Sequence, residues 1–414
     1  MIIKTIRFLF KALGALILLL LVVFFVIYAI APVYQFPEYK SFAGDKIYNP
    51  YRDTDSSVWK KGNFQVQSRV WGGITDGRTN SNEAIQTIYG LLGYDIIVTS
   101  DYMKINRFGE DEPGYIPTYE HGYGIRKTHQ VCIGSEKVNW VDYPFYTNKH
   151  HKQHILNILR KNNQIVAIAH PSLRGGHTLE DMRILTNYDL IEVLNELKSS
   201  IEHWDAALSS GHRAFILSND DAHDIFDPSE VGRKCTFVNA PSGRGPEVIQ
   251  ALKRGRAYGM DIGYTPGSDF VERAEIHKYL PQLDWVRVVK DTLLVKVSKK
   301  AKLISFIGQN GIIKSTVADT NQAMYKITPS DTYIRTEIAY NDRTIMYLNP
   351  VFRYSGAAPA DPEMPTIDQS KTWVQRGVAL IITIIVLLIV SRLMRGGPKK
   401  KSRISRRTYY SYTR

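Results

Sequence analysis

The sequence predicts an α/β fold, a parallel sheet or barrel, held between two apolar segments that each predict a membrane-spanning helix. Three observations support this. From residue 63 to about residue 259, short apolar strands alternate with amphipathic helices. Chemically active polar side chains follow the ends of several of these strands. Long uncharged apolar runs lie close to both termini.

The first apolar run covers residues 12–31, which are 20 residues without a charge. This length matches a bilayer core of roughly 30 Å, so we expect a transmembrane helix here, preceded by a basic stretch at 1–11. A cleaved signal peptide is the alternative, because Ala29-Ile30-Ala31 has the small-x-small form of a cleavage site. The run is longer than the apolar region of a usual signal peptide and Pro32 follows it, so we favour an uncleaved anchor.

The second apolar run, residues 377–391, is short, and Trp373 and Val374 extend it to a predicted transmembrane helix at 373–391. A basic tail, residues 392–414, follows it.

The formal net charge of +13 belongs to the two ends of the chain. Residues 1–14 carry three basic side chains and residues 392–414 carry nine, with no acidic side chain in either stretch, so the region between them is close to neutral. Basic residues mark the cytoplasmic side of a membrane protein. We therefore expect an inner (plasma) membrane protein with both termini cytoplasmic and the main domain extracytoplasmic. This placement of the charge argues against a nucleic-acid partner.

The region between the anchors begins with a lead-in, residues 32–58, that has no clear periodicity. The α/β pattern then occupies residues 59–270. Its predicted strands are 64–68, 96–99, 165–169, 190–194 and 214–217. We expect helices from about Ala84 to Leu92, after a capping box of Thr178 and Asp181, and from Pro246 to Arg254.

Acidic and histidine side chains, which can bind metal ions or transfer protons, lie directly after these strands. Asp101 follows the second strand, His170 the third, and Asp221 with His223 the fifth. The carboxyl ends of the strands form the active face of α/β barrels. This succession predicts a functional site at that face.

From about residue 286 the apolar pattern alternates, which predicts strands. Asn310-Gly311 is a hairpin signal. We expect a small β domain at 285–354 and a linker, rich in Ala, Pro and Asp, at 355–371.

The cysteines, Cys132 and Cys235, are compatible with a disulfide or with two buried thiols.

Four segments carry a family resemblance. They are GNFQVQS at 62–68 with TDG at 75–77, SDY at 100–102, Glu120 with His129, and the pair AHP at 169–171 and DAH at 221–223. Together they resemble the PHP (polymerase and histidinol phosphatase) superfamily of metal-dependent phosphoesterases, over about residues 59–260. The resemblance implies a distorted (β/α)7 barrel.

The resemblance also implies site residues. The metal ligands would be Glu120, His129, His170, Asp221 and His223. Asp76 and Asp101 match acidic positions of the motifs and are predicted to be catalytic, as is Arg233, which suits pairing with a phosphate. Three alternatives stay open: Asp76 as a plain turn residue, residues 119–124 as a plain loop, and Arg233 as the partner of an acid elsewhere in the chain.

Three positions depart from the family pattern, since Gln65, Gln67 and Tyr102 stand where the family has histidines. Glutamine is a poor zinc ligand, and tyrosine binds such ions well only when deprotonated. The set Glu120, His129 and His170 keeps its ligands, which predicts one divalent ion (zinc, manganese or iron) rather than three.

We therefore predict a membrane-tethered, extracytoplasmic hydrolase of a phosphate ester, whose substrate the sequence does not identify. The alternative is an inactive PHP-like barrel that acts as a scaffold or binding module with envelope protein partners.

Overall fold

The computed structural model describes residues 2–74 and 77–395. The chain forms two compact units, one made of both terminal segments (1–33 and 368–414) and one made of residues 34–367. Most of the predicted basic tail, residues 392–414, lies outside the described residues, as does Asp76.

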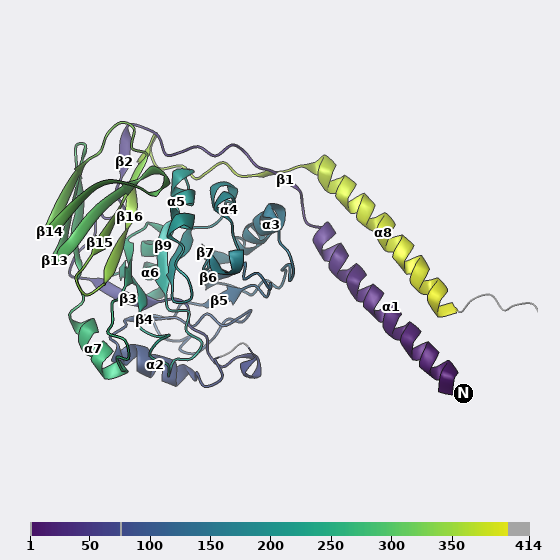
Figure 1. Cartoon of the computed structure of the whole chain (residues 1–414). Coiled ribbons are helices and arrows are strands. Elements are labelled where there is room, and N and C mark those ends of the chain that lie inside the picture. Colours follow the sequence, from purple (N-terminus) through teal and green to yellow (C-terminus); the bar gives the residue numbers. More distant parts are fainter. Residues whose placement is uncertain (1, 75–76, 396–414) are drawn as a thin grey trace, which may run out of the picture. The chain divides into compact units, whose positions relative to one another are not determined.

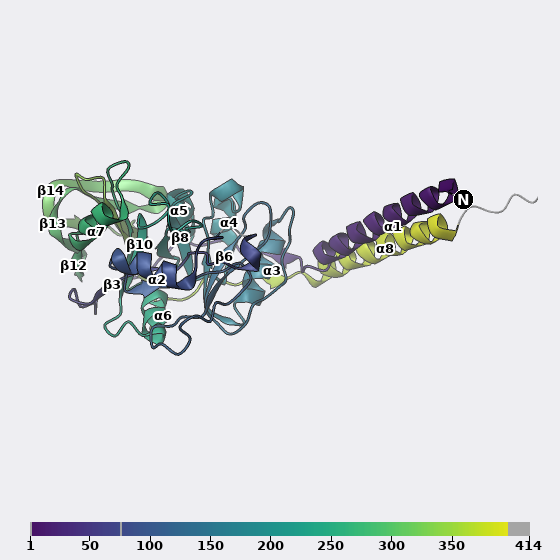
Figure 2. The same cartoon turned by 90° about the horizontal axis from the view of Figure 1, so that it is seen from below.

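The terminal unit consists of two apolar helices, α1 (Ile2–Ala29) and α8 (Gln369–Arg395), which lie side by side (Figures 1 and 2). The stretches Phe8–Ala29 and Gln369–Met394 are long and apolar enough to cross a membrane. The last carbonyl groups of a helix have no hydrogen-bond partners within that helix. At the carboxyl end of α1, side chains of α8 are the hydrogen-bond donors to such carbonyls. The amide of Gln375 donates to the carbonyl of Ala29 at 2.9 Å, and Arg376 donates to that of Ile30 at 2.8 Å. The two helices are compatible with membrane anchoring, and the topology stays a prediction.

The larger unit contains a ten-stranded sheet with the order β12-β13-β15-β16-β11-β10-β3-β4, to which β14 and β2 add at β13 and β16. Its pairs are antiparallel except β3 with β4. The strands are β2 (Lys46–Tyr48), β3 (Trp59–Asn63), β4 (Ile96–Ile97), β10 (Lys234–Asn239), β11 (Ala257–Asp261), β12 (Leu283–Val289), β13 (Thr292–Gly308), β14 (Ile312–Lys326), β15 (Tyr333–Ala339) and β16 (Ile345–Tyr354).

A second sheet has the order β5-β6-β7-β8-β9, antiparallel from β5 to β7 and parallel from β7 to β9. Its strands are β5 (Thr118–His121), β6 (Gln130–Ser135), β7 (Asn163–Ile168), β8 (Leu190–Asn195) and β9 (Phe215–Asn219). Isolated bridges join its two edges to the first sheet, Tyr102 with Glu120 on one side and Val66 with Ala222 on the other. The result is a mixed α/β unit with a curled sheet. Only part of it is parallel, and the (β/α)7 fold itself stays a prediction.

Helices of the larger unit pack on these sheets. They are α2 (Asn82–Leu91), α3 (Lys149–Leu159), α4 (Leu179–Ile184), α5 (Ile201–Ser209), α6 (Gly245–Lys253) and α7 (Phe270–Lys278), with short 3-10 turns at Trp71–Gly73, Leu173–Gly175 and Gln309–Gly311. The predicted capping box is confirmed: Thr178 accepts from the backbone of Asp181, whose side chain accepts from Thr178 in return.

The first predicted strand is displaced. We expected residues 64–68, whereas the ladder covers Trp59–Asn63. Beyond Asn63 the chain stays buried but leaves the ladder, because the amide of Phe64 donates to the side chain of Asn219 at 2.7 Å. The glutamines at 65 and 67 therefore lie where the two sheets meet.

The region predicted as a small β domain forms strands β12 to β16, and Asn310-Gly311 forms the turn between β13 and β14. Both views show this hairpin at the opposite end of the larger unit from α3 (Figures 1 and 2). Strand β16 pairs with β11, so these strands continue the sheet that contains β3. The division at 285–354 stays a proposal.

The two ends of the larger unit meet in a short ribbon. Strand β1 (Tyr34–Gln35) pairs antiparallel with β17 (Thr366–Ile367). Both cysteines are buried and free, Cys132 in β6 and Cys235 in β10.

Candidate metal centre

Three buried side chains from neighbouring strands converge at one point. Glu120 lies in β5, His129 directly precedes β6, and His170 follows β7. The Nδ1 atom of His129 lies 2.5 Å from Oε1 of Glu120, and Nε2 of His170 lies 3.4 Å from the same oxygen. Their candidate ligand atoms all lie within 4.8 Å of one another. Among the described residues, this is the group of His, Cys, Asp and Glu side chains that could hold a metal ion.

The pairing of β5 with β6 explains this proximity. His121 pairs with Gln130, so His129 lies one residue beyond the ladder, against Gly122. A Cβ atom on Gly122 would lie 2.6 Å from the His129 ring, and its φ of +123° is one that L residues rarely adopt. A glycine is therefore needed where the imidazole packs. Residues 118–121 form a strand, so this part of the 119–124 stretch is not a loop.

Two residues of the site have left-handed backbone conformations, His170 with φ +28° and Asp221 with φ +55°. Such conformations are unfavourable for residues with a side chain and are typical of functional sites. Hydrogen bonds from their backbone amides hold both: the amide of His170 donates to the carboxylate of Glu192 at 2.9 Å, and that of Asp221 donates to the carbonyl of Gln65 at 3.0 Å.

Several buried polar atoms around the three ligands have no hydrogen-bond partner. They are both amide atoms of Gln65, Oε1 of Gln67, Nδ1 of His170 and Oδ1 of Asp221. A buried polar atom without a partner costs about 1–3 kcal/mol. A divalent cation bound by a His2Glu set, together with its water, would give the orphaned oxygens a partner, so the residues present fit a metal ion.

The charge state of the cluster follows from its burial and its neighbours. Burial raises the pKa of Glu120, but hydrogen bonds and positive charge from His129 and His170 outweigh this and hold it well below the usual range. Burial lowers the pKa of His129 despite the nearby carboxylate. Burial also lowers the pKa of His170, but the hydrogen bond to Glu120 and the negative charge of Asp221 have the larger effect and raise this pKa to about 9. A metal ion that binds these imidazoles would displace any proton that they hold.

The predicted ligands Asp221 and His223 lie beside this cluster. Oδ2 of Asp221 lies 3.9 Å from Nε2 of His170 and accepts from Asn195 at 3.1 Å. His223 is half-buried, and its Nδ1 lies 2.8 Å from the carbonyl oxygen of Asp221. Their roles as ligands stay predictions.

Two of the predicted catalytic residues, Asp101 and Arg233, have partners outside the three-ligand cluster. The carboxylate of Asp101 accepts from the backbone and hydroxyl of Ser68, each at 2.8 Å. Arg233 pairs with Glu196 at 2.7 Å and lines a separate hollow that contains Arg273. Asp76 lies outside the described residues. All three roles stay predictions.

Gln67 and Tyr102 also contact the centre. The amide of Gln67 donates to Oε2 of Glu120 at 2.8 Å and to the carbonyl of Ser100 at 3.0 Å, which fixes the carboxylate. The ring of Tyr102 lies edge-on to that of His129, with centroids 5.5 Å apart.

The sequence reasoning missed a supporting carboxylate, Glu192 in β8. It accepts from the amide of His170, from Asn195 at 3.0 Å and from Asn219 at 2.8 Å. Burial, reinforced by Asp221, raises its pKa to about 8. The signal was a glutamate within the apolar strand Leu190–Asn195, where an acid is rarely buried without a partner.

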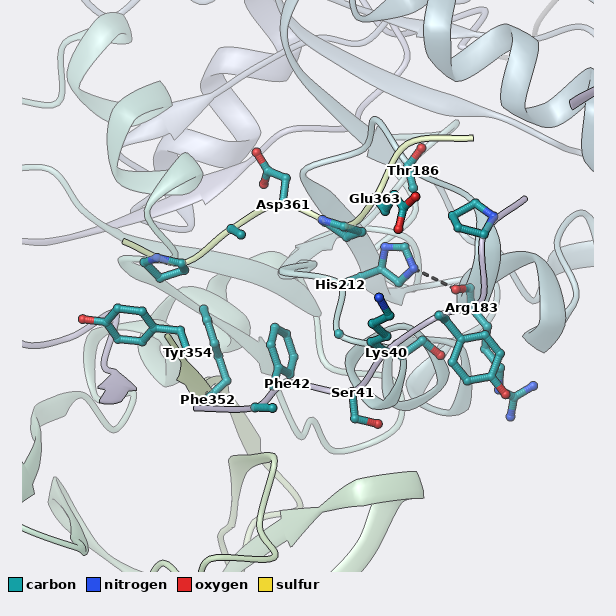
Figure 3. A pocket seen from close by; sticks show the side chains of 18 of the residues that line it. Lys40, Ser41, Phe42, Arg183, Thr186, His212, Phe352, Tyr354, Asp361 and Glu363 are labelled. Atoms are coloured by element: carbon teal, nitrogen blue, oxygen red, sulfur yellow. Dashed lines mark hydrogen bonds between the residues drawn. The ribbon is translucent and has the colours of Figure 1, made fainter. Parts of the chain in front are cut away.

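A second hollow, of about 370 Å³, lies between the lead-in and the linker (Figure 3). His212 lines it, but its Nε2 is bonded to the carbonyl of Arg183 at 2.8 Å. Glu363 and Asp361 come from the linker, and Asp361 pairs with Arg213. This hollow lies apart from the three-ligand cluster.

No protein-family model matches the chain. No curated protein matches it either. A solved structure, a two-domain protein containing a predicted PHP-like metal-dependent phosphoesterase from Bacteroides vulgatus ATCC 8482, is similar with 13% identity. The match covers 74% of this chain and 100% of that one, with a TM-score of 0.35. A TM-score of this size does not establish a shared fold.

Proposed function

We propose that the chain is a membrane-tethered, extracytoplasmic, metal-dependent phosphoesterase of the PHP type, with a single divalent ion held by Glu120, His129 and His170. The observation that carries the proposal is the convergence of these three donors beside orphaned polar atoms. When bound, the ion would supply Lewis acidity and a water of lowered pKa. Zinc, manganese and iron suit a His2Glu set.

The chain's own residues would prepare this chemistry. Gln67 holds one oxygen of Glu120, which leaves the other oxygen for the cluster. Glu192 fixes the backbone of His170, and Asn195 fixes Asp221. Because these supports are buried hydrogen bonds, the ligands are held in place before an ion binds.

The test is the metal content of the full-length chain, purified in detergent without chelator. We expect about one ion per chain, as a single His2Glu set implies. His170→Ala should lose it. The matched control is His121→Gln, because His121 is also buried, next to Glu120, but its ring bonds Gln130 and the carbonyl of Val141. No metal in the wild type after incubation with zinc, manganese or iron would end the proposal.

The competing function is a catalytically inactive barrel that serves as a scaffold for envelope proteins. One observation favours it: Gln65 and Gln67 are fully buried where the family has ligands. A metal-loaded chain that hydrolyses neither p-nitrophenyl phosphate nor lipid phosphates would support this alternative.

The proposed topology has its own test. A reporter fused after residue 414 should report the cytoplasm, and one inserted in the 355–371 linker should report the other side of the membrane. The positive-inside pattern of basic residues is the reason. The opposite result would overturn the extracytoplasmic placement without touching the metal site.

A further inference from the structure

A cavity of about 550 Å³ opens beside the metal centre. His129 and His223 lie on its wall together with Tyr102 and Lys127. It is therefore the space through which a substrate would reach the three ligands.

Several of the remaining wall residues are apolar and exposed. Ile74 is 84% exposed, Ile125 is 64% exposed and Trp140 is 59% exposed. Trp71 faces Trp140 edge to face, with ring centroids 6.1 Å apart. Contiguous apolar surface with a polar neighbour is characteristic of binding sites.

This wall is anchored at its base. The indole N–H of Trp71 donates to the carbonyl of Tyr102 at 2.7 Å, which fixes the ring relative to the metal centre. The amide of Tyr123 donates to Asp142 at 2.8 Å. The aromatic surface is thus preformed, and binding would need little further ordering of this wall.

The polar end of the cavity carries a positive charge. The ammonium of Lys127 lies over the ring of Tyr102, 5.4 Å from its centroid. Among residues 2–74 and 77–395, no carboxylate side chain lines the cavity beside it. An anionic group between Lys127 and the metal centre would supply the missing counter-charge.

We infer that this cavity binds the alcohol part of the substrate, and that the substrate is an amphiphilic phosphate ester whose alcohol is large and apolar. The inference rests on the proposed function, because the metal centre defines where the phosphate lies. The phosphate lies toward Lys127 and His129, and the apolar group lies against Trp71, Trp140 and Ile125. A small polar alcohol group, such as that of glycerol, would not cover these apolar side chains, which would stay exposed to water.

The test measures binding without turnover. Methylphosphonate and naphthylmethylphosphonate share a phosphate-like group, and their P–C bonds resist hydrolysis. Calorimetric titration of the metal-loaded, full-length chain in detergent should show about 10- to 100-fold tighter binding of the naphthyl compound, from the apolar area it buries. Trp140→Ala should remove most of this preference and leave the affinity for methylphosphonate unchanged.

Two further variants separate the two ends of the cavity. Lys127→Met should weaken both phosphonates by a similar factor, since it removes a charge that both contact. Tyr279→Ala is the matched control, because Tyr279 is an exposed aromatic residue at the end of α7 and lies outside the cavity wall. It should change neither affinity.

Three outcomes would overturn the inference. Equal affinity for both phosphonates would do so while leaving the proposed function intact, provided the chain still binds its metal ion. Equally tight binding of naphthylmethanol would show a plain apolar surface, suited to a lipid bilayer or a protein, instead of a phosphate-ester site. A chain that takes up no metal ion and binds neither phosphonate would remove the inference together with the proposed function.

Discussion

Two of the sites where the larger unit buries charged side chains differ in how completely those side chains are paired. Arg335 in β15 and Asp205 in α5 form a two-pronged ion pair, at 2.7 and 2.9 Å, that Tyr333 completes at 3.2 Å. At the metal centre, Glu120, His170 and Asp221 are equally buried, but atoms of His170, Asp221 and two glutamines have no partner. A fully paired cluster fixes one structure, whereas an underpaired one stays costly until a ligand completes it.

The largest effect should come from breaking the paired cluster. Asp205→Ala removes the two-pronged partner of the buried Arg335 guanidinium and leaves it only Glu337, at 3.2 Å, which we expect to cost about 3 kcal/mol of unfolding free energy. Chemical denaturation of the purified chain measures it. The double variant Asp205→Leu/Arg335→Met removes both charges and should recover much of the loss. If the single and double variants are equally destabilised, the charge pairing is not what holds this region.

Acidification should destabilise the protein through His212, a buried imidazole that is hydrogen-bonded to the carbonyl of Arg183. Burial lowers its pKa to about 4, whereas the unfolded chain titrates near the usual value of about 6.5. The unfolded state therefore binds more protons between these values, so stability is complete above pH 6.5 and is lost as pH falls toward 4. The shift corresponds to about 3 kcal/mol.

Unfolding free energy measured at pH 7 and pH 4.5 tests this, with His212→Asn as the comparison. The variant should lose less stability on acidification than the wild type. An unchanged pH slope would assign the acid sensitivity to other buried groups, of which His277 is the first to examine because burial lowers its pKa to about 3.

Glu192→Gln tests the support behind the underpaired cluster. We expect metal affinity to fall about 10- to 100-fold, because residues that orient metal ligands have effects of this size. Glu196→Gln is the matched control, since Glu196 directly follows Asn195 but pairs with Arg233. Competition with a chromogenic chelator measures both. Equal affinities in the two variants would show that Glu192 does not position His170.

The smallest effect should have the opposite sign. Gln65→Leu replaces two orphaned buried atoms with an apolar side chain, so the metal-free protein should gain about 1 kcal/mol of stability. A thermal melt in the presence of chelator measures it. A loss of stability would mean that Gln65 has partners, such as buried water, and would weaken the contrast between the two clusters.

Much of this arrangement was accessible from the sequence. The apolar pattern predicted helices α2, α4 and α6 and strands β4, β7, β8 and β9, but not helices α3, α5 and α7. The motifs predicted Glu120, His129 and His170, which the structure brings together. The curled, largely antiparallel sheet was not predictable in this way, because strand direction depends on pairings between residues far apart in the chain. The capping box at Thr178 was predictable because it is local.

The hydrogen-bond partners of Glu192 and Arg233 were not predictable either, because they also depend on contacts between residues far apart in the chain. Each depends on a partner from a different strand, namely Asn219 for Glu192 and Glu196 for Arg233. Motif matching places a residue near a strand end but does not tell which neighbour it faces.

The ribbon of β1 and β17 has a consequence for how the larger unit can be rearranged. Tyr34 pairs with Ile367, so the two ends of this unit lie one strand spacing apart. A unit whose ends meet can be circularly permuted, because a short peptide can join them without strain. Linking residue 367 to residue 34 and opening the chain at an exposed loop, such as Gly109, would yield a soluble version released from both apolar helices.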